Sequence, residues 1–225
     1  MSESRPTIAI LGGGGSEGSG LAFRWSRAGY RVIIGSRDAG KAASFARAIY
    51  ERTGTEVSGY ANTDAAKVGD IVVLTVPYSA QRALAEEVAV FLEGKIVIDV
   101  TVPLMPPKVA RVQLPQGGSA VEALQQRLGT GVRVVSAFQN VSAHQLSDPD
   151  HDVDCDVLVS GDDEGARDIV CKLAGDIGLR AWQAGPLANS AAAEALTSVL
   201  IFINKRYNVA KGSGIRISGI ENSAQ

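Results

Sequence analysis

The chain has 225 residues, a formal net charge of -2 and 45% hydrophobic residues, which suffices for one ordinary domain with a smaller second part. Lysines and arginines are scattered singly, so no basic stripe predicts nucleic acid or a membrane surface as partner. Cys155 and Cys171 lack metal-ligand spacing, and no other cluster predicts a metal site. Because we find neither a signal segment nor an apolar run of about 18 residues, we expect a cytoplasmic protein.

A glycine-rich turn follows the first apolar run, residues 8–11, and precedes an expected helix over residues 17–28. The turn satisfies G-x-G-x-x-G, and a second apolar run follows at residues 31–35. A strand, this turn, a helix and a strand form the context in which the motif binds a dinucleotide, because backbone N–H groups without neighbouring Cβ atoms can approach a pyrophosphate. The residues expected at the pyrophosphate are Gly13, Gly14, Gly15, Ser16, Glu17 and Gly18.

The end of the second expected strand selects the dinucleotide. An NAD site usually has an acidic residue there, whereas the 2′-phosphate of NADP needs a cation and hydroxyl donors. This chain has Ser36 and Arg37, with Lys41 one turn into the next helix. We interpret Asp38 as a helix-start residue, which the helix dipole stabilises. The sequence therefore predicts NADP.

Alternating helices and strands continue through the first 140 residues. We expect helices over residues 39–52, 63–68, 79–91 and 119–128, and strands over residues 56–61, 70–76, 95–100 and 132–138. The strand at 70–76 ends in Thr75, Val76, Pro77 and Tyr78, which we expect along the nicotinamide half of the cofactor, because α/β sheets bind ligands at the carboxyl ends of their strands. The proline-rich stretch 104–118 predicts a loop over the site. The last of these strands delivers Gln139 and Asn140 to the same edge.

This alternation predicts an α/β fold with a Rossmann-type, doubly wound, mostly parallel sheet. We expect residues 1–140 to bind NADP and a smaller part, residues 141–225, to complete the site. That part contains expected strands at 155–160 and 179–183, a helix at 162–174 and a long apolar helix at 188–207, with a possible short strand at 214–218. A helix this apolar needs a partner surface, and a homodimer is the simplest way to provide one.

No residue is predicted to be catalytic. His144 and His151 lie in a polar stretch, and no Ser/His/Asp order or Tyr-x-x-x-Lys pair occurs. Reducing a small carbonyl or imine needs a positioned acid, whereas passing a hydride between two ring cofactors needs mainly stacking and distance. The sequence favours transfer between cofactors, although Tyr78 or Lys205 would serve as an acid in the alternative.

Several blocks together resemble the NADP oxidoreductases that use the deazaflavin coenzyme F420. They are LGGGGSEGSGLA, GSRD, LTVPY, VVSAF, SGDDE and AGPLANS, and the resemblance extends from Ile8 to about Ile217. It implies an enzyme in which the nicotinamide and the deazaflavin stack and exchange a hydride directly. It also implies that Val102, Leu187 and Asn189 lie near the deazaflavin.

One departure from the family concerns the stretch after the strand at 132–138. Archaeal members tend to have His, Thr and a proline there, whereas this chain has Gln139, Asn140 and Val141. Glutamine exchanges hydrogen bonds but carries no proton at neutral pH. Alternative acceptors therefore remain open: a flavin, a pterin or a small imino or hydroxy acid. A module that senses NADP without catalysis is the alternative from another class.

Overall fold

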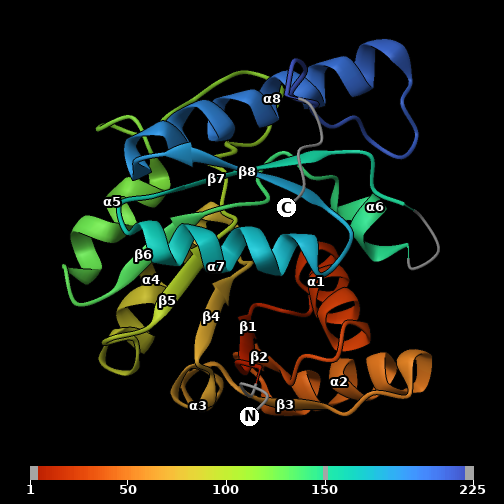
Figure 1. Cartoon of the computed structure of the whole chain (residues 1–225), viewed down its shortest axis with the longest axis vertical. Coiled ribbons are helices and arrows are strands. Elements are labelled where there is room, and N and C mark those ends of the chain that lie inside the picture. The colour runs from red at the N-terminus through yellow and green to blue at the C-terminus, as the bar shows by residue number, and fades with distance from the viewer. Residues whose placement is uncertain (1–4, 149–151, 221–225) are drawn as a thin grey trace.

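The computed structural model describes residues 5–148 and 152–220 of the chain (Figure 1). Within them, one eight-stranded sheet has the order β3-β2-β1-β4-β5-β6-β7-β8. Neighbouring strands are parallel except β6 and β7, which are antiparallel. The predicted doubly wound, mostly parallel fold is confirmed. The expectation for His151 falls outside the described ranges.

The strands are β1 (Ile8–Leu11), β2 (Val32–Ser36), β3 (Val57–Ala61), β4 (Ile71–Leu74), β5 (Ile96–Asp99), β6 (Arg133–Ser136), β7 (Asp156–Gly161) and β8 (Arg180–Gly185). The helices are α1 (Ser16–Arg27), α2 (Ala39–Thr53), α3 (Asn62–Val68), α4 (Tyr78–Val88), α5 (Ala120–Leu128), α6 (Ala143–Ser147), α7 (Glu164–Gly175) and α8 (Ser190–Tyr207). Two 3-10 turns are η1 (Ala89–Phe91) and η2 (Leu187–Asn189).

The central strands β1 and β4 are apolar at every position because helices cover both faces of the sheet. In β1, Ile8 and Ile10 belong to one apolar core, whereas Ala9 and Leu11 belong to the other. Residues of α1, α2 and α7 complete the first core, and residues of α3, α4 and α5 complete the second. Figure 1 shows α7 lying across the sheet, and α8 at the end of the molecule away from α2 and α3.

Trp25 joins the two halves of the first core. Its indole Nε1 donates a hydrogen bond of 2.9 Å to the carbonyl of Leu173 on α7, and its ring meets that of Phe138 edge-on at 5.8 Å. Both rings are buried. Helix α1, which carries the glycine turn at its start, is thereby fixed to the C-terminal part of the chain.

The structure differs from the expectations in three places. The direction of β7 reverses, the short helix α6 follows β6, and residues 214–218 do not form a strand. Residues 215 and 217 instead bond to Asp156 at the start of β7: the Asp156 amide donates to the Ile215 carbonyl, and the Ile217 amide donates to the Asp156 carboxylate. These residues therefore bind Asp156 through individual hydrogen bonds and do not pair along a strand.

The stretch Leu187–Tyr207 is long and apolar enough to cross a membrane by length and mean hydropathy alone, which the count of consecutive apolar residues missed. Such a test is weak evidence for a single helix. In the structure Glu194 and Ser198 of this helix are buried against the protein.

Candidate functional site

The glycine turn and the end of β4 meet at the point where the strand order reverses. Strand β1 pairs with β2 on one side and with β4 on the other, and chain crossovers leave in opposite directions from there. Sheets of this type bind ligands in the crevice outside that point. Thr75 holds the two segments together, because its hydroxyl donates a hydrogen bond of 2.9 Å to the carbonyl of Leu11.

Two glycines of the turn are required by their surroundings. Gly12 has a φ of +77°, and a Cβ there would lie 2.4 Å from the side chain of Val76. A Cβ on Gly18 would lie 2.7 Å from the Cα of Gly13 and 2.6 Å from the Thr75 hydroxyl. Helix α1 therefore begins in close contact with the sheet, and its free N–H groups face the crevice.

A first cavity, which we call the α4 cavity, has a volume of about 440 Å³ and lies between the glycine turn and α4. Its lining includes Gly12, Gly14, Gly15, Ser36, Arg37, Phe45, Asn62, Thr75, Val76, Pro77, Ala80, Ala83, Leu84 and Glu87. A hydroxyl and a guanidinium thus stand at one side of the cavity and apolar side chains at another. This combination suits a phosphate next to a flat, apolar ring.

The structure confirms the prediction that Asp38 is a helix-start residue. Its carboxylate accepts a hydrogen bond of 3.1 Å from the backbone N–H of Lys41, which caps α2. It is thereby engaged with the helix rather than with the cavity. Lys41 itself is exposed and does not contribute to the lining of the α4 cavity, whereas Ser36 and Arg37 do.

A second cavity, the α8 cavity, has a volume of about 530 Å³ and shares Gly15, Thr75, Val76 and Pro77 with the first. From the glycine turn and the strand ends it is lined by Gly15, Ser16, Glu17, Thr75, Val76, Pro77, Tyr78, Val100, Thr101, Val102 and Leu104. From β6 onward it is lined by Gln139, Asn140, Val141, Ser142, Ala143, Thr197, Leu200, Ile201, Asn204 and Ser213. The C-terminal part of the chain therefore supplies one wall of this cavity.

Buried polar atoms without a partner gather at the two cavities. Among the described residues, such atoms occur in Asn62, Thr101, Ser136, Gln139 and Ser213. Asn62 lines the α4 cavity, and Thr101, Gln139 and Ser213 line the α8 cavity. Buried polar groups are nearly always hydrogen-bonded in proteins. Four of these five residues belong to the walls of the two cavities.

One acid, Glu17, lines the α8 cavity, and a second, Asp99 on β5, acts on it electrostatically without being part of the lining. Asp99 is fully buried, and its carboxylate accepts hydrogen bonds from the Thr101 amide at 2.9 Å and from the Gln81 side chain. Burial raises the pKa of Asp99, and these donors oppose that rise. Burial, followed by the charge of Asp99, raises the pKa of Glu17 to about 8. Glu17 nevertheless remains partly accessible, because it faces the cavity.

The side chain of Gln139 is held from below. Its Nε2 donates a hydrogen bond of 2.8 Å to the carbonyl of Asp99. Its Oε1 has no hydrogen-bond partner among the described residues. Next to it, the Asn140 amide donates to the Ala193 carbonyl at 2.8 Å and to the Thr197 hydroxyl at 3.1 Å. The end of β6 is thus fastened to α8.

Two residues suggested by the family resemblance lie away from both cavities. Leu187 is buried in the second apolar core, and its amide donates to the carboxylate of Asp162. The Asn189 side chain donates back to the Ala184 carbonyl at 2.7 Å. Neither residue lines either of the two cavities, because β7 and β8 run opposite to β6 and η2 follows β8. That Leu187 and Asn189 lie near the second cofactor stays a prediction.

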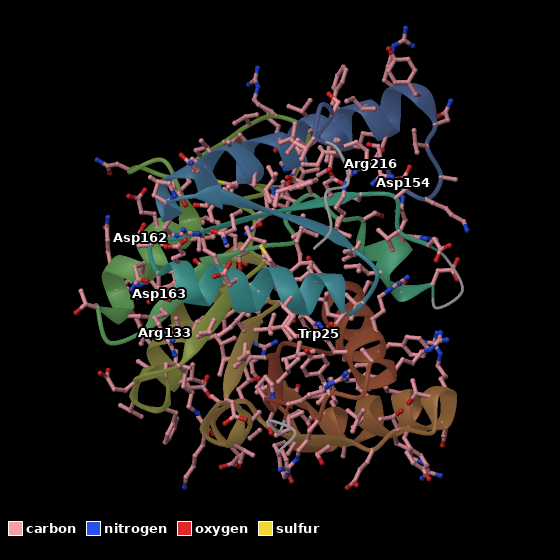
Figure 2. The ribbon with its side chains drawn as sticks, viewed as in Figure 1. Trp25, Arg133, Asp154, Asp162, Asp163 and Arg216 are labelled. Carbon is pink, nitrogen blue, oxygen red and sulfur yellow. The ribbon has the colours of Figure 1, made fainter. Side chains whose placement is uncertain are left out.

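Of the two acids considered for small-molecule reduction, Tyr78 lines the α8 cavity, and Lys205 is exposed on α8 outside its lining. His144, on α6, does not line it either. Another cavity, of about 490 Å³, includes Arg133, Asp162 and Asp163, which Figure 2 labels on the side of the molecule away from Arg216. It contains none of the predicted site residues.

Several lining residues were not singled out from the sequence. Asn62 directly follows β3, so its place at the carboxyl end of a strand was a usable signal. Thr197, Leu200, Ile201 and Asn204 recur at helical spacing on α8, but the sequence shows only that this side is apolar. Ser213 lies in irregular chain and carried no signal at all.

Comparison with known proteins places this site in a family. A family model described as "NADP oxidoreductase coenzyme F420-dependent" matches residues 7–103. The F420-dependent NADP reductase of Methanocaldococcus jannaschii is 44% identical over 95% of this chain and 99% of its own length. The reductase of the same name from Methanothermobacter marburgensis is 41% identical over 95% and 98%.

A solved structure from Arthrobacter sp. FB24 superposes with a TM-score of 0.77 at 26% identity, covering 91% of this chain and 96% of that one. The similarity to the two archaeal reductases extends over nearly the full length of each protein, so it includes both cavity walls. The chain belongs to the family of coenzyme F420-dependent NADP oxidoreductases.

Proposed function

We propose that this protein transfers a hydride between NADP(H) and coenzyme F420, with the two bound in the adjoining α4 and α8 cavities. The observation that carries the proposal is the junction of the cavities at Gly15 and residues 75–77, the carboxyl edge of β4. A dinucleotide laid across this junction has one end in each cavity. The relatives that share this sequence at 44% and 41% identity are named F420-dependent NADP reductases.

The α4 cavity suits the adenosine half of NADP(H). Ser36 and Arg37 are positioned to bind the 2′-phosphate, since an arginine and a hydroxyl provide charge-assisted hydrogen bonds. Phe45, Ala83 and Leu84 offer apolar surface for the adenine. In the described residues no ion pair engages Arg37, so its guanidinium is available for a phosphate.

The pyrophosphate is proposed to lie over residues 13–18, where the start of α1 supplies N–H groups and the positive end of its dipole. The nicotinamide then extends past residues 75–78 into the α8 cavity. The remaining wall, which includes Val102, Gln139 and α8, is left for the deazaflavin. Apolar side chains there would exclude water, while the unpartnered atoms of Thr101, Gln139 and Ser213 would orient its ring.

Little acid–base machinery is needed for such a reaction. The two cofactors carry the redox chemistry, and the protein contributes proximity, orientation and a dry site. In the described lining of the α8 cavity we find a lone carboxylic acid, Glu17, and no histidine or lysine. This composition fits hydride transfer between rings better than reduction of an imine or a hydroxy acid.

The test is the absorbance of NADPH mixed with purified protein and oxidised F420, with FMN, FAD and a pterin offered separately. We expect rapid oxidation with F420 and little with the others. Oxidation with a different acceptor alone would contradict the proposed second substrate. Binding of NADPH without oxidation by any acceptor would support the sensing module instead.

We further propose that the protein is a cytoplasmic homodimer that associates through α8. Val199 and Phe202 are 42% and 57% exposed on this helix, which is more apolar surface than a solvated helix usually shows. The buried Glu194 and Ser198 support a helix that packs on protein rather than in lipid. The division of the chain at residue 140 stays a prediction: residues 1–140 bind NADP, and residues 141–225 complete the site.

A further inference from the structure

Glu17 is placed on the nicotinamide side of the glycine turn. It lines the α8 cavity but not the α4 cavity. If the 2′-phosphate of NADP(H) is at Arg37 in the α4 cavity, the other end of the dinucleotide must pass the shared residues Gly15 and Thr75 into the α8 cavity. The Glu17 carboxyl group then faces the space that receives the nicotinamide ring.

The groups around Glu17 leave it without a compensating cation. Among the residues lining the α8 cavity in the described chain, the titratable side chains are Glu17 and Tyr78. The charge of Asp99, on β5, adds to burial in raising the pKa of Glu17 and that of Glu194 on α8, and His144 is on α6, which packs against α1. No lysine or arginine is part of the described lining.

The two acids, Glu17 in the cavity lining and Asp99 on β5, are unequally supported by hydrogen bonds. Asp99 receives hydrogen bonds from Thr101 and Gln81, whereas no donor reaches the Glu17 carboxyl group in the described residues. Hydrogen bonds to a carboxylate favour its ionised form, and two close acids rarely both ionise. Glu17 therefore holds its proton at neutral pH, in agreement with its raised pKa of about 8.

We propose that Glu17 balances the charge of the nicotinamide: its carboxyl group is protonated beside the neutral reduced ring and ionised beside the cationic oxidised ring. This inference rests on the proposed function. When the reduced ring loses a hydride, with its two electrons, it becomes a cation. The O–H bond of Glu17 then breaks, leaving a carboxylate beside that cation, and the proton released matches the one that the acceptor takes up with each hydride. The charge of the pair is zero in both states.

The test measures binding of NADP⁺ and NADPH separately by calorimetry from about pH 6.5 to about pH 9.5. As pH rises, the ratio of the Kd for NADP⁺ to the Kd for NADPH should fall about tenfold or more, because one pKa unit corresponds to a tenfold change. The 2′-phosphate is common to both ligands and cancels in the ratio. Titrations in two buffers of different ionisation enthalpy should show proton release on binding NADP⁺ near neutral pH.

Glu17→Gln keeps the size of the side chain and removes its titration. We expect its Kd ratio to stay within about twofold over the whole range. Glu164→Gln is the matched control, because Glu164 is also an acid in the first turn of a helix but is exposed on α7; it should behave like the wild type. A wild-type ratio that does not change with pH, or a Glu17→Gln protein that keeps the change, overturns the inference while leaving NADP binding intact. Failure of both dinucleotides to bind would overturn the proposed function as well.

Discussion

The carboxylate of Glu194, on α8, accepts a hydrogen bond of 2.6 Å from the hydroxyl of Ser119, the residue that caps α5. The same carboxylate accepts the backbone N–H groups of Ala120 at 2.8 Å and Val121 at 3.2 Å. A helix thus has its first free N–H groups satisfied by an acid that lies 73 residues or more away along the chain. This contact ties the end of the proline-rich loop to the helix that walls the α8 cavity.

Replacing Glu194 by alanine should therefore loosen two elements at once. The Ala120 and Val121 amides and the Ser119 hydroxyl would lose a buried acceptor, at a cost of about 3 kcal/mol in the free energy of unfolding. Urea denaturation measures that cost, and hydrogen exchange of the two amides reports where it arises. The control, Glu122→Ala in the first turn of α5, should lower the free energy of unfolding by less than about 1 kcal/mol. Unchanged protection of both amides would contradict the assigned cap.

Arg37 is predicted to read the 2′-phosphate. Arg37→Glu should weaken NADPH binding by about ten- to a hundredfold, since one charge-assisted hydrogen bond contributes about 1.5–3 kcal/mol, and it should change NADH binding much less. Fluorescence titration of both dinucleotides measures the difference. Arg31→Glu makes the same charge change at an exposed residue before β2 and serves as control. Equal losses of affinity for NADPH and NADH would contradict the assignment of Arg37 to the 2′-phosphate.

Two glycines of the turn should fail in different ways. Gly18→Ala places a Cβ 2.7 Å from the Gly13 Cα, so we expect a loss of about 1–3 kcal/mol in stability. At Gly15 the nearest atom to an added Cβ is the Gly12 carbonyl oxygen at 3.8 Å. Gly15→Ala should therefore fold normally but bind NADPH about tenfold or more weakly, because the methyl group occupies the approach of the pyrophosphate. Thermal unfolding and NADPH titration of both variants separate the two effects.

Asp156 should make stability depend on acid pH. It is fully buried and accepts hydrogen bonds from Arg180 at 2.8 Å, Trp182 at 2.8 Å, the Ile217 amide at 2.7 Å and Arg216 at 3.2 Å. Burial alone would raise the pKa of Asp156, but these donors hold it well below its usual value. Because the folded pKa lies below the unfolded value of about 3.9, the stabilisation is present above that pH and lost as pH falls towards the folded pKa.

Asp156→Asn should accordingly cost about 3–5 kcal/mol at neutral pH, since it leaves the Arg180 pair broken. The difference from wild type should shrink below about pH 4. Urea denaturation at a series of pH values measures this. Asp154, which pairs with Arg216 at the surface where Figure 2 labels both, provides the control: Asp154→Asn should leave stability nearly unchanged. A constant difference across the acid range would count against the assignment.

The part of the fold that could be predicted is the part where each strand is buried on both faces. Strands β1 and β4 are uninterrupted apolar runs between turn signals, β5 is apolar as far as Asp99 at its end, and that pattern has few other solutions. The cap by Asp38 was equally local. The reversal of β7 was not predictable, because parallel and antiparallel strands have the same period of two. The position of Leu187 outside both cavities could not be foreseen for that reason, since the position of everything after β7 depends on the reversal.

Helix α8 follows the two strands that run opposite to β6. Its 18 residues form about 27 Å of helix. Glu194 fixes the rotation of the helix at α5, and Thr197, Leu200 and Asn204 meet the cavity farther along. Inserting one residue between Glu194 and Thr197 would turn the cavity wall by about 100° about the helix axis. The spacing of residues along this helix therefore shapes the cavity wall as much as their identity does.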